Sequence, residues 1–243
     1  MDSLKKDILE LGAIVQRDRE TYAIAPHIPG GITDADTLMK LAEVAKKYQV
    51  QAIKVTSAQR IALVGIREDD IESAWNDLGM DKGAAIGMCV RSVKVCPGTT
   101  FCKRAKQDSV ALGLELDKRY HGHPLPGKFK IGVSGCPNSC AENAVKDLGF
   151  MGTKDGYTIM VGGNAAGRPR LAEPILMGKS HEEALEIADR VINLYSTVAR
   201  KGQRLGTFID AIGVDLLKNY LEAPTSELAG RQEQVSAQYA TAK

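Results

Sequence analysis

The 243-residue sequence has few aromatic residues and almost no net charge. Aromatic side chains make up 5% of the chain, with a single tryptophan, so there is little surface on which nucleic-acid bases could stack. The formal net charge is +2 at pH 7, which is too small to attract nucleic acid or an anionic membrane strongly. Both observations argue against a protein that binds nucleic acid or a membrane surface.

Long apolar runs are also absent. No segment approaches the roughly 18 apolar residues of a membrane-spanning helix, and the opening MDSLKKDILELG alternates charged with apolar residues instead of forming a signal peptide. We therefore expect a protein of the reducing cytoplasm. The hydrophobic fraction of 44% suffices for a full core in one large domain or two small ones.

The five cysteines are the most informative residues. Four of them form two close pairs, Cys96-x5-Cys102 in VCPGTTFC and Cys136-x3-Cys140 in GCPNSC, whereas Cys89 stands apart. Glycine, proline and asparagine within both segments predict tight turns that hold the thiols in place. Cys89 is predicted to be a buried apolar residue.

Three kinds of site compete for the paired cysteines. Two disulfides are disfavoured by the odd cysteine count and the missing signal peptide. A structural zinc site prefers pairs separated by two to four residues. Thiolates are also the usual ligands of iron–sulfur clusters, so an iron–sulfur site is favoured over the other two.

Residues 20–82 predict the order strand–helix–strand–strand–helix. The strands lie in TYAIAPHI, QAIKVT and RIALVGI, and the helices lie in DADTLMKLAEVAKKYQ and IESAWNDLG. Thr33 or Asp34 is predicted to cap the first helix and Gly79 to stop the second. This order is typical of a ferredoxin-like α/β sandwich, and a short amphipathic helix to about Gly12 is expected to precede it.

A second α/β module is expected to follow. Strands are predicted in MCVRSVKV, KFKIGVS, AVKDLGFMG and GYTIMVGG, and helices over 103–120, 180–200 and 206–221. The fold class is therefore α+β. The predicted domains are residues 1–82, residues 83–223 and a polar C-terminal tail, 224–243, that forms a loosely attached helix or is disordered.

The two cysteine pairs, with GCPNSC as the second, resemble the siroheme-dependent nitrite and sulfite reductase family. The likeness runs from about Tyr22 to about Leu217, and in that family a ferredoxin-like module precedes each siroheme- and [4Fe–4S]-binding module. The resemblance implies that the four paired cysteines hold a [4Fe–4S] cluster and that Cys140 also bridges to the iron of siroheme. Larger members contain two related halves, and this chain resembles one half.

The resemblance also implies residues that hold siroheme, whose many carboxylates require cations and N–H donors. Lys103, Arg104 and Lys106 are predicted in the first turn of the 103–120 helix, where the side chains and the helix terminus together bind anions. The segment GGNAAGRPR, 162–170, resembles a siroheme-contacting loop of the family. Its assigned residues, together with the asparagine of GCPNSC, are Gly163, Asn164, Arg168, Arg170 and Asn138.

KVTSAQR resembles a family segment, R-L-T-x-R-Q, that wraps the macrocycle. Lys54 stands where an arginine is usual, and Thr56 and Gln59 match the pattern. Ala58 replaces a second arginine. Because alternate residues of an unbroken strand share a face, Arg60 is predicted to supply the missing charge.

The substrate-binding residues implied by the resemblance are Arg91, Lys128, Lys130 and His27. In KFK, both lysines point to one face of a strand while Phe129 packs on the other. Arg91 and Cys96 would lie on opposite faces of a regular strand, so a bend or bulge is predicted between them. His27 stands where larger sulfite reductases carry an arginine, and it is either a donor to the anion or a core histidine.

These expectations predict a siroheme/[4Fe–4S] reductase that carries out the six-electron reduction of a small oxyanion. Sulfite reduction to sulfide is favoured; nitrite reduction to ammonia and a non-catalytic electron-transfer or sensing protein are the alternatives. The chain has no flavin or dinucleotide motif, so an external electron donor, such as a ferredoxin or a partner subunit, is expected. A homodimer is also expected, in which each chain supplies basic residues to its neighbour's cofactor.

Overall fold

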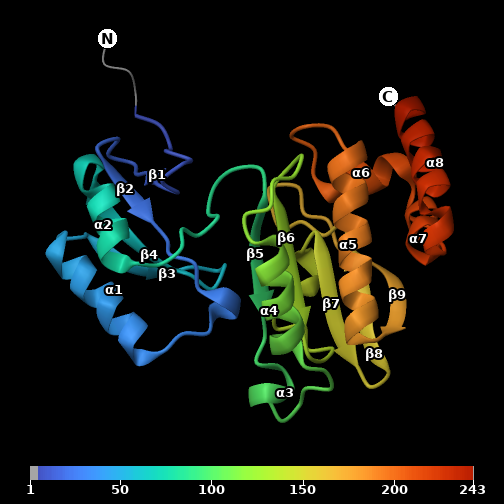
Figure 1. The fold of residues 1–243 in the computed structure, drawn as a ribbon, viewed down its shortest axis with the longest axis horizontal. Helices are drawn as coiled ribbons and strands as arrows, with labels where there is room; N and C mark the ends of the chain where they lie inside the picture. Colours follow the sequence, from blue (N-terminus) through green and yellow to red (C-terminus); the bar gives the residue numbers. More distant parts are fainter. Residues whose placement is uncertain (1–4, 243) are drawn as a thin grey trace. The chain divides into compact units, whose positions relative to one another are not determined.

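The computed structural model describes residues 5–242, which divide into two compact units at residues 87 and 88 (Figure 1). Each unit has its own hydrophobic core. Within the described residues, no helix combines the length and the apolar character needed to cross a membrane.

The first unit is a four-stranded antiparallel sheet with two helices. Its elements are β1 (Ile14–Val15), β2 (Thr21–Ile24), η1 (Pro29–Gly31), α1 (Ala35–Lys47), β3 (Ala52–Val55), β4 (Ile61–Arg67), η2 (Glu68–Asp70) and α2 (Ile71–Leu78). The strand order is β1-β2-β4-β3, and the ferredoxin-like prediction is confirmed. Asp34 caps α1 by accepting a hydrogen bond from the Thr37 N–H, and Gly79 ends α2 with a φ of 57°.

Two predictions for the first unit are wrong. Of the N-terminal helix predicted to Gly12, residues 1–4 lie outside the described residues, and 5–12 form turns with a bridge between Ile8 and Ala13. The separate strands predicted in QAIKVT and RIALVGI are confirmed, but Lys54 and Arg60 do not lie on one unbroken strand, because β3 ends at Val55 and a tight turn joins it to β4. A positive φ of 58° at Gln59 closes that turn.

The second unit is a five-stranded mixed sheet with helices α4 and α5 in front of it in Figure 1. Its elements are β5 (Val90–Val95), α3 (Gly98–Phe101), α4 (Ser109–Tyr120), β6 (Phe129–Ser134), η3 (Asn143–Val145), β7 (Leu148–Thr153), β8 (Gly156–Val161), β9 (Glu173–Lys179), α5 (His181–Val198), α6 (Leu205–Ile212), α7 (Val214–Glu222), η4 (Thr225–Glu227) and α8 (Leu228–Thr241). The strand order is β5-β6-β7-β8-β9. β5, β6 and β7 are parallel, and the pairs β7–β8 and β8–β9 are antiparallel.

Two helix boundaries predicted from the sequence are wrong in this unit. The helix expected over 103–120 begins at Ser109, because Asp108 accepts hydrogen bonds from the N–H groups of Val110 and Ala111. The helix expected over 206–221 is two helices that meet at Gly213, where φ is 87°. Lys103, Arg104 and Lys106 therefore do not belong to a first helical turn.

The C-terminal residues are not a loose tail. They form α8, whose Val235 and Tyr239 are buried in the core of the second unit. The Tyr239 ring lies edge-on to Phe208, with the ring centroids 5.2 Å apart. The polar composition of this segment belongs to the exposed face of α8, and its widely spaced apolar residues dock the helix.

Candidate metal and anion site

The topology of the second sheet brings the two cysteine pairs to one edge. β5 and β6 are parallel neighbours, so their carboxyl ends lie side by side. Cys96 directly follows β5, and Cys136 lies two residues beyond β6. The Cys96 N–H still donates to the Val133 carbonyl over 3.1 Å, which holds the first cysteine against the neighbouring strand.

The two cysteine loops touch through Gly135. Its carbonyl accepts hydrogen bonds from the N–H groups of Lys106 at 2.7 Å and Gln107 at 3.1 Å. A Cβ atom at residue 135 would lie 2.7 Å from the Gln107 carbonyl oxygen and 3.1 Å from the Cα of Gly98. Glycine is therefore required where the segment after Cys102 crosses the segment before Cys136.

All five cysteines are free thiols in the structure, with Cys96 buried and Cys140 exposed. The Gly135 N–H donates to the Cys96 Sγ over 3.1 Å, and the Ser109 Oγ lies 3.2 Å from the same sulfur. Hydrogen bonds to sulfur tune the potential of iron–sulfur clusters. Four thiols on two touching loops, with a backbone N–H that donates to the Cys96 sulfur, fit a [4Fe–4S] cluster. Cys89 is buried, as expected of an apolar residue.

The second cysteine loop is held in an unusual conformation. Ser139 and Glu142 both have positive φ, 52° and 60°, although neither is glycine. Buried Asn143 holds the end of this loop in place, because its Nδ2 donates to the carbonyls of Gly132 and Phe150 at 2.8 and 2.6 Å. Strained backbone fixed in this way is common at functional sites. Asn138, assigned to the cofactor, is exposed on this loop.

A cluster of cations lies around the β6 strand that leads to this loop. Lys128 and Lys130 flank Phe129, which is fully buried, so the KFK pattern places the aromatic ring as predicted. The β5–β6 register shifts between Val90 and Ser92, and the predicted irregularity between Arg91 and Cys96 therefore begins at Arg91 itself.

The charges of this cluster act on one another. The pKa of Lys128 is lowered by burial and then by the positive charges of Arg91 and Arg204. The pKa of Lys130 is lowered by burial and then by the charges of Lys128, Lys146 and Arg204. Asp147 opposes both shifts. The structure thus groups Arg91, Lys128 and Lys130 in one electrostatic site.

Sequence reasoning missed three members of this group: Lys146, Asp147 and Arg204. Asp147 is fully buried and receives the Arg204 guanidinium at 2.8 to 3.0 Å. Lys146 is also buried and pairs with Glu142 at 2.8 Å, as does Lys94. These two ammonium groups lower the pKa of Glu142 to about 2. The sequence did contain a signal for this group: Lys146 and Asp147 stand together just before a strand, and charged residues are seldom buried there without partners.

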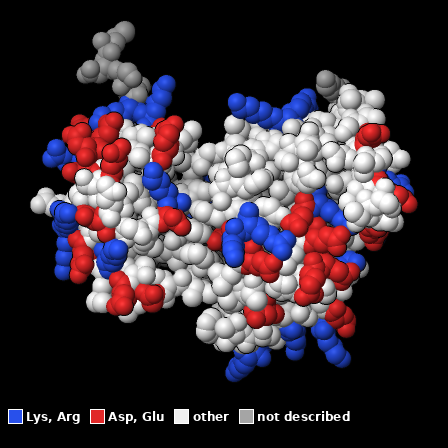
Figure 2. Space-filling model, viewed as in Figure 1, with Lys and Arg blue, Asp and Glu red and all other residues white. Residues whose placement is uncertain are grey.

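Lys103, Arg104 and Lys106 are exposed on the irregular segment between α3 and α4. They directly follow Cys102, and Figure 2 shows Lys and Arg side chains at the end of the second unit where α3 lies. Their charges therefore adjoin the cysteine loops without a helix terminus to assist them.

The glycine-rich loop 162–170 is shaped by Arg170. Asn164 and Arg170 form an isolated β-bridge, and the Arg170 guanidinium donates to the Gly162 carbonyl and pairs with Glu173 and Asp210. These contacts commit Arg170 to closing the loop, whereas Arg168 is exposed on it. Gly163 packs so tightly that a Cβ atom would lie 2.5 Å from the Lys146 carbonyl oxygen.

In the first unit, Thr56, Gln59 and Arg60 line a single cavity of about 270 Å³. The turn is tight: the Thr56 N–H donates to the Arg60 carbonyl at 2.8 Å, and the Arg60 N–H donates to the Thr56 Oγ1 at 3.2 Å. Arg60 is buried, whereas Lys54 is exposed on β3. The His27 N–H donates to the Asp81 carbonyl at 2.8 Å, so the backbone of His27 is fixed within its own unit.

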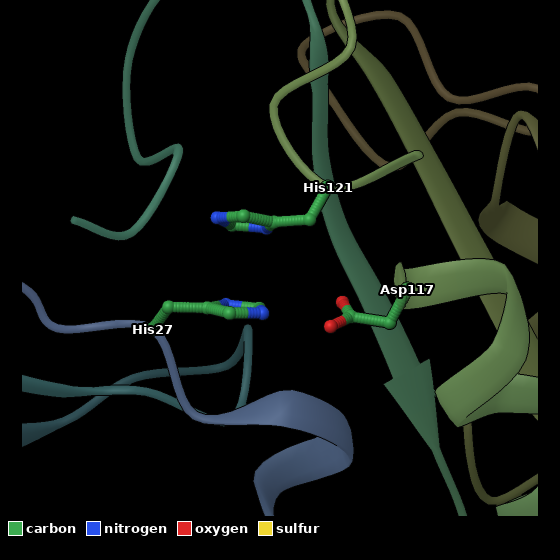
Figure 3. A group of neighbouring side chains, drawn as sticks. All are labelled: His27, Asp117 and His121. Carbon is green, nitrogen blue, oxygen red and sulfur yellow. The ribbon is translucent and has the colours of Figure 1, made fainter. Parts of the chain in front are cut away.

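Figure 3 shows two further polar residues of the second unit, Asp117 and His121. Asp117 lies in the last turn of α4, and the His121 N–H donates to the Asp117 carbonyl at 2.8 Å. The four-residue spacing makes both side chains project to the same side. His27, also drawn there, belongs to the first unit.

Comparison with known proteins identifies two domains in the chain. Residues 86–228 match the nitrite and sulphite reductase 4Fe-4S domain, and residues 14–80 match the nitrite/sulfite reductase ferredoxin-like half domain. An assimilatory-type sulfite reductase of Nitratidesulfovibrio vulgaris is 40% identical over 207 residues, which are 85% of this chain and 95% of the relative. A nitrite reductase [NAD(P)H] of Bacillus subtilis is 37% identical over 91% of this chain but 28% of its own length.

Solved structures show the same fold. Mycobacterium tuberculosis NirA aligns with a TM-score of 0.72 at 22% identity, covering 86% of this chain and 40% of that chain. Dissimilatory sulfite reductase I aligns with a TM-score of 0.75 at 15% identity, covering 84% of this chain and 69% of that chain. Siroheme and a [4Fe–4S] cluster are the cofactors of the reductases that share these two domains. On the evidence of both domains, the chain belongs to the nitrite and sulphite reductase family of oxidoreductases.

Proposed function

We propose that this protein reduces sulfite to sulfide, with Arg91, Lys128 and Lys130 as the residues that bind the anion. The observation that carries the proposal is the position of Lys130 on β6, with Lys128 directly before the strand, because β6 leads into the Cys136 loop. The 40% identity to a small sulfite reductase, over nearly the whole of that relative, supports sulfite as the substrate.

The protein's residues have two tasks in this reaction. Bound siroheme and the cluster supply the path for electrons and the iron at which the anion is reduced. Arg91 and the two lysines hold the anion's oxygens with charge-assisted hydrogen bonds. Each sulfite takes up six electrons and six protons, and its oxygens leave as three water molecules. Lysines with lowered pKa values are suited to give protons to those departing oxygens.

We further propose cofactor contacts for the residues assigned from the sequence. Cys96, Cys102, Cys136 and Cys140 are the cluster ligands, with Cys140 as the bridge to siroheme. The exposure of Cys140, in contrast to buried Cys96, supports that division. The basic segment after Cys102, the 162–170 loop and the turn at Gln59 are the candidate siroheme contacts.

The test begins with anaerobic purification, followed by a visible spectrum and counts of iron, acid-labile sulfide and zinc. Turnover is then measured with sulfite and a chemically reduced viologen dye, and the sulfide formed is quantified. Lys130→Met should lower kcat about 100- to 1,000-fold, because a positioned electrostatic group at the reacting centre is lost. Lys118→Met, which removes an exposed lysine of α4, is the matched control. Colourless protein, or coloured protein that forms no sulfide, would contradict the proposal.

Nitrite is the second candidate substrate, because relatives at 34–38% identity include several nitrite reductases. Comparing kcat/KM for sulfite and nitrite with one reduced dye separates the two. We propose that the natural electrons come from a separate donor protein and that the reaction takes place in the cytoplasm, which the five free thiols support.

We also propose a homodimer. β3 is the outer strand of the first sheet and pairs with β4 on one side. Its Ile53 and Val55 side chains are 51% and 76% exposed, and exposed apolar edge strands tend to pair with another chain. Sedimentation of the holoprotein should show a dimer, and Ile53→Lys should weaken it. Leu38→Lys, which changes an exposed residue of α1, should leave the dimer intact. A fully active monomer would rule the dimer out.

A further inference from the structure

A buried ion pair between Asp147 and Arg204 contacts β6 at the backbone of Lys130. Asp147 is the last residue before β7 and Arg204 is the last residue before α6. The Arg204 Nε and one of its terminal nitrogens, Nη2, donate to the carboxylate oxygens of Asp147 over 2.8 to 3.0 Å. The Asp147 side chain is 0% exposed and that of Arg204 is 23% exposed, so water competes little for these bonds.

Asp147 also holds the backbone of Lys130. The regular β6–β7 register begins at the pair Ile131 and Leu148, one residue beyond Lys130. At that point the Asp147 Oδ2 accepts the Lys130 N–H over 2.8 Å. The carboxylate therefore extends the sheet's hydrogen bonding by one residue and fixes the lysine just where the strand begins.

Arg204 connects the same pair to the glycine-rich loop. Its second terminal nitrogen donates to the Asn164 Oδ1 over 3.2 Å, and the Gly162 N–H donates to the Asp147 carbonyl over 2.8 Å. β6 and the 162–170 loop are thus joined through the salt bridge between Asp147 and Arg204.

We propose that Asp147 and Arg204 are positioning residues of the anion site, which hold Lys130 and the Asn164 loop in a fixed relation. This inference rests on the proposed function. Neither side chain touches the anion in this account. Asp147 acts through the Lys130 backbone, and Arg204 acts through Asp147 and Asn164.

The pair is also nearly neutral as a whole. Arg204 adds to the positive charges that act on Lys128 and Lys130, and Asp147 offsets them. Removing either partner therefore both loosens the lysine and changes the charge of the site. We expect both effects to weaken the binding of the anion.

The test uses the holoprotein and three variants: Arg204→Lys, Arg204→Gln and Asp147→Asn. Sulfite affinity is measured by titrating the visible spectrum, and kcat and KM are measured with a reduced dye. We expect kcat/KM to fall about 10- to 100-fold in Arg204→Gln and Asp147→Asn, as for other outer partners of a reactive site. Arg204→Lys should lie between these and the original protein, because one ammonium keeps the charge but cannot reach Asp147 and Asn164 together. Iron and sulfide content should be unchanged, and sulfite affinity is expressed per bound siroheme, because Asn164 lies on the loop proposed to contact siroheme.

Arg190→Gln is the matched control, because Arg190 has a 13% exposed side chain and bonds to Glu186 and to the Leu221 and Ala223 carbonyls. The inference is overturned if the Asp147 and Arg204 variants bind sulfite normally per bound siroheme, or if Arg190→Gln shows the same loss. If the original holoprotein binds sulfite without reducing it, the proposed function fails, and the titration still decides the role of the pair. If it binds no sulfite, the inference fails as well.

Discussion

The Gly135 N–H donates a hydrogen bond to the Cys96 Sγ across 3.1 Å and 39 positions of sequence. This bond joins the loop of the second cysteine pair to the thiol of the first. It exists because parallel β5 and β6 end at the same edge of the sheet and because residue 135 has no side chain. The geometry of the predicted cluster site thus depends on one glycine.

Gly135→Ala should therefore remove most of the bound iron and acid-labile sulfide. The new Cβ would lie 2.7 Å from the Gln107 carbonyl oxygen and 3.1 Å from the Gly98 Cα, so the two cysteine loops must separate. Metal and sulfide analysis of anaerobically purified protein measures the effect. Gly230→Ala in α8 is the control, since no atom lies within 4 Å of its added Cβ. A normal cluster in Gly135→Ala would mean that the loops need not touch.

The two lysines predict how sulfite binding depends on pH. Burial, followed by neighbouring cations, lowers the pKa of Lys128 and of Lys130 below the ordinary 10.5. Each ammonium therefore loses its proton at a lower pH than an ordinary lysine, and the KM for sulfite should rise with pH before 10.5 is reached. Lys130→Gln should flatten this rise, and Lys118→Gln should leave it unchanged. Steady-state kinetics on the alkaline side provide the measurement.

The same shifts predict the opposite trend for stability. Between the lowered folded pKa and the ordinary unfolded value, the unfolded chain binds more protons than the folded one, so the free energy of unfolding rises with pH in that window. Chemical denaturation without an anion, repeated across the window, tests this. If the free energy of unfolding instead fell as the pH rose through this window, the folded protein would favour the ammonium forms of these lysines, and the prediction would be wrong.

Much of the fold followed from local patterns. β2, β4, α1 and α2 of the first unit agree with the prediction, and Asp34 and Gly79 mark helix ends as expected. The cysteine spacing identified the two loops. These features were predictable because each depends on residues close together in the sequence.

The missed features depend on contacts between distant residues. Asp147 and Arg204 are 57 positions apart, and the Lys-Asp dipeptide draws attention to Asp147 without identifying its partner. The start of α4 was predicted too early because residues 103–107 are of types that favour a helix. Asp108 and the contact of Gln107 with Gly135 set the observed boundary. The break at Gly213 was hidden because the apolar pattern continues through it.

Gly31→Ala should disturb the turn that carries Gln59. Gly31 has a φ of 71°, and an added Cβ would lie 2.7 Å from the Gln59 Cβ. The backbone conformation alone should cost about 1–2 kcal/mol. Because Gln59 is a proposed siroheme contact, we expect siroheme content to fall more than iron–sulfur content, as measured by absorbance and acid-labile sulfide. Equal losses of both cofactors would place the effect in folding and not in siroheme binding.

The docking of α8 predicts that the C-terminal segment stabilises the second unit. The Tyr239 hydroxyl accepts a hydrogen bond from the Arg200 Nε at 2.8 Å and donates to the Gln203 side chain, while its ring packs on Phe208. Tyr239→Ala should lower the free energy of unfolding by about 3–5 kcal/mol, and Tyr239→Phe by about 1 kcal/mol. Gln238→Ala, an exposed neighbour in the same helix, should have little effect. Urea denaturation of the four proteins decides the matter, because a freely moving tail would leave Tyr239→Ala as stable as the unaltered protein.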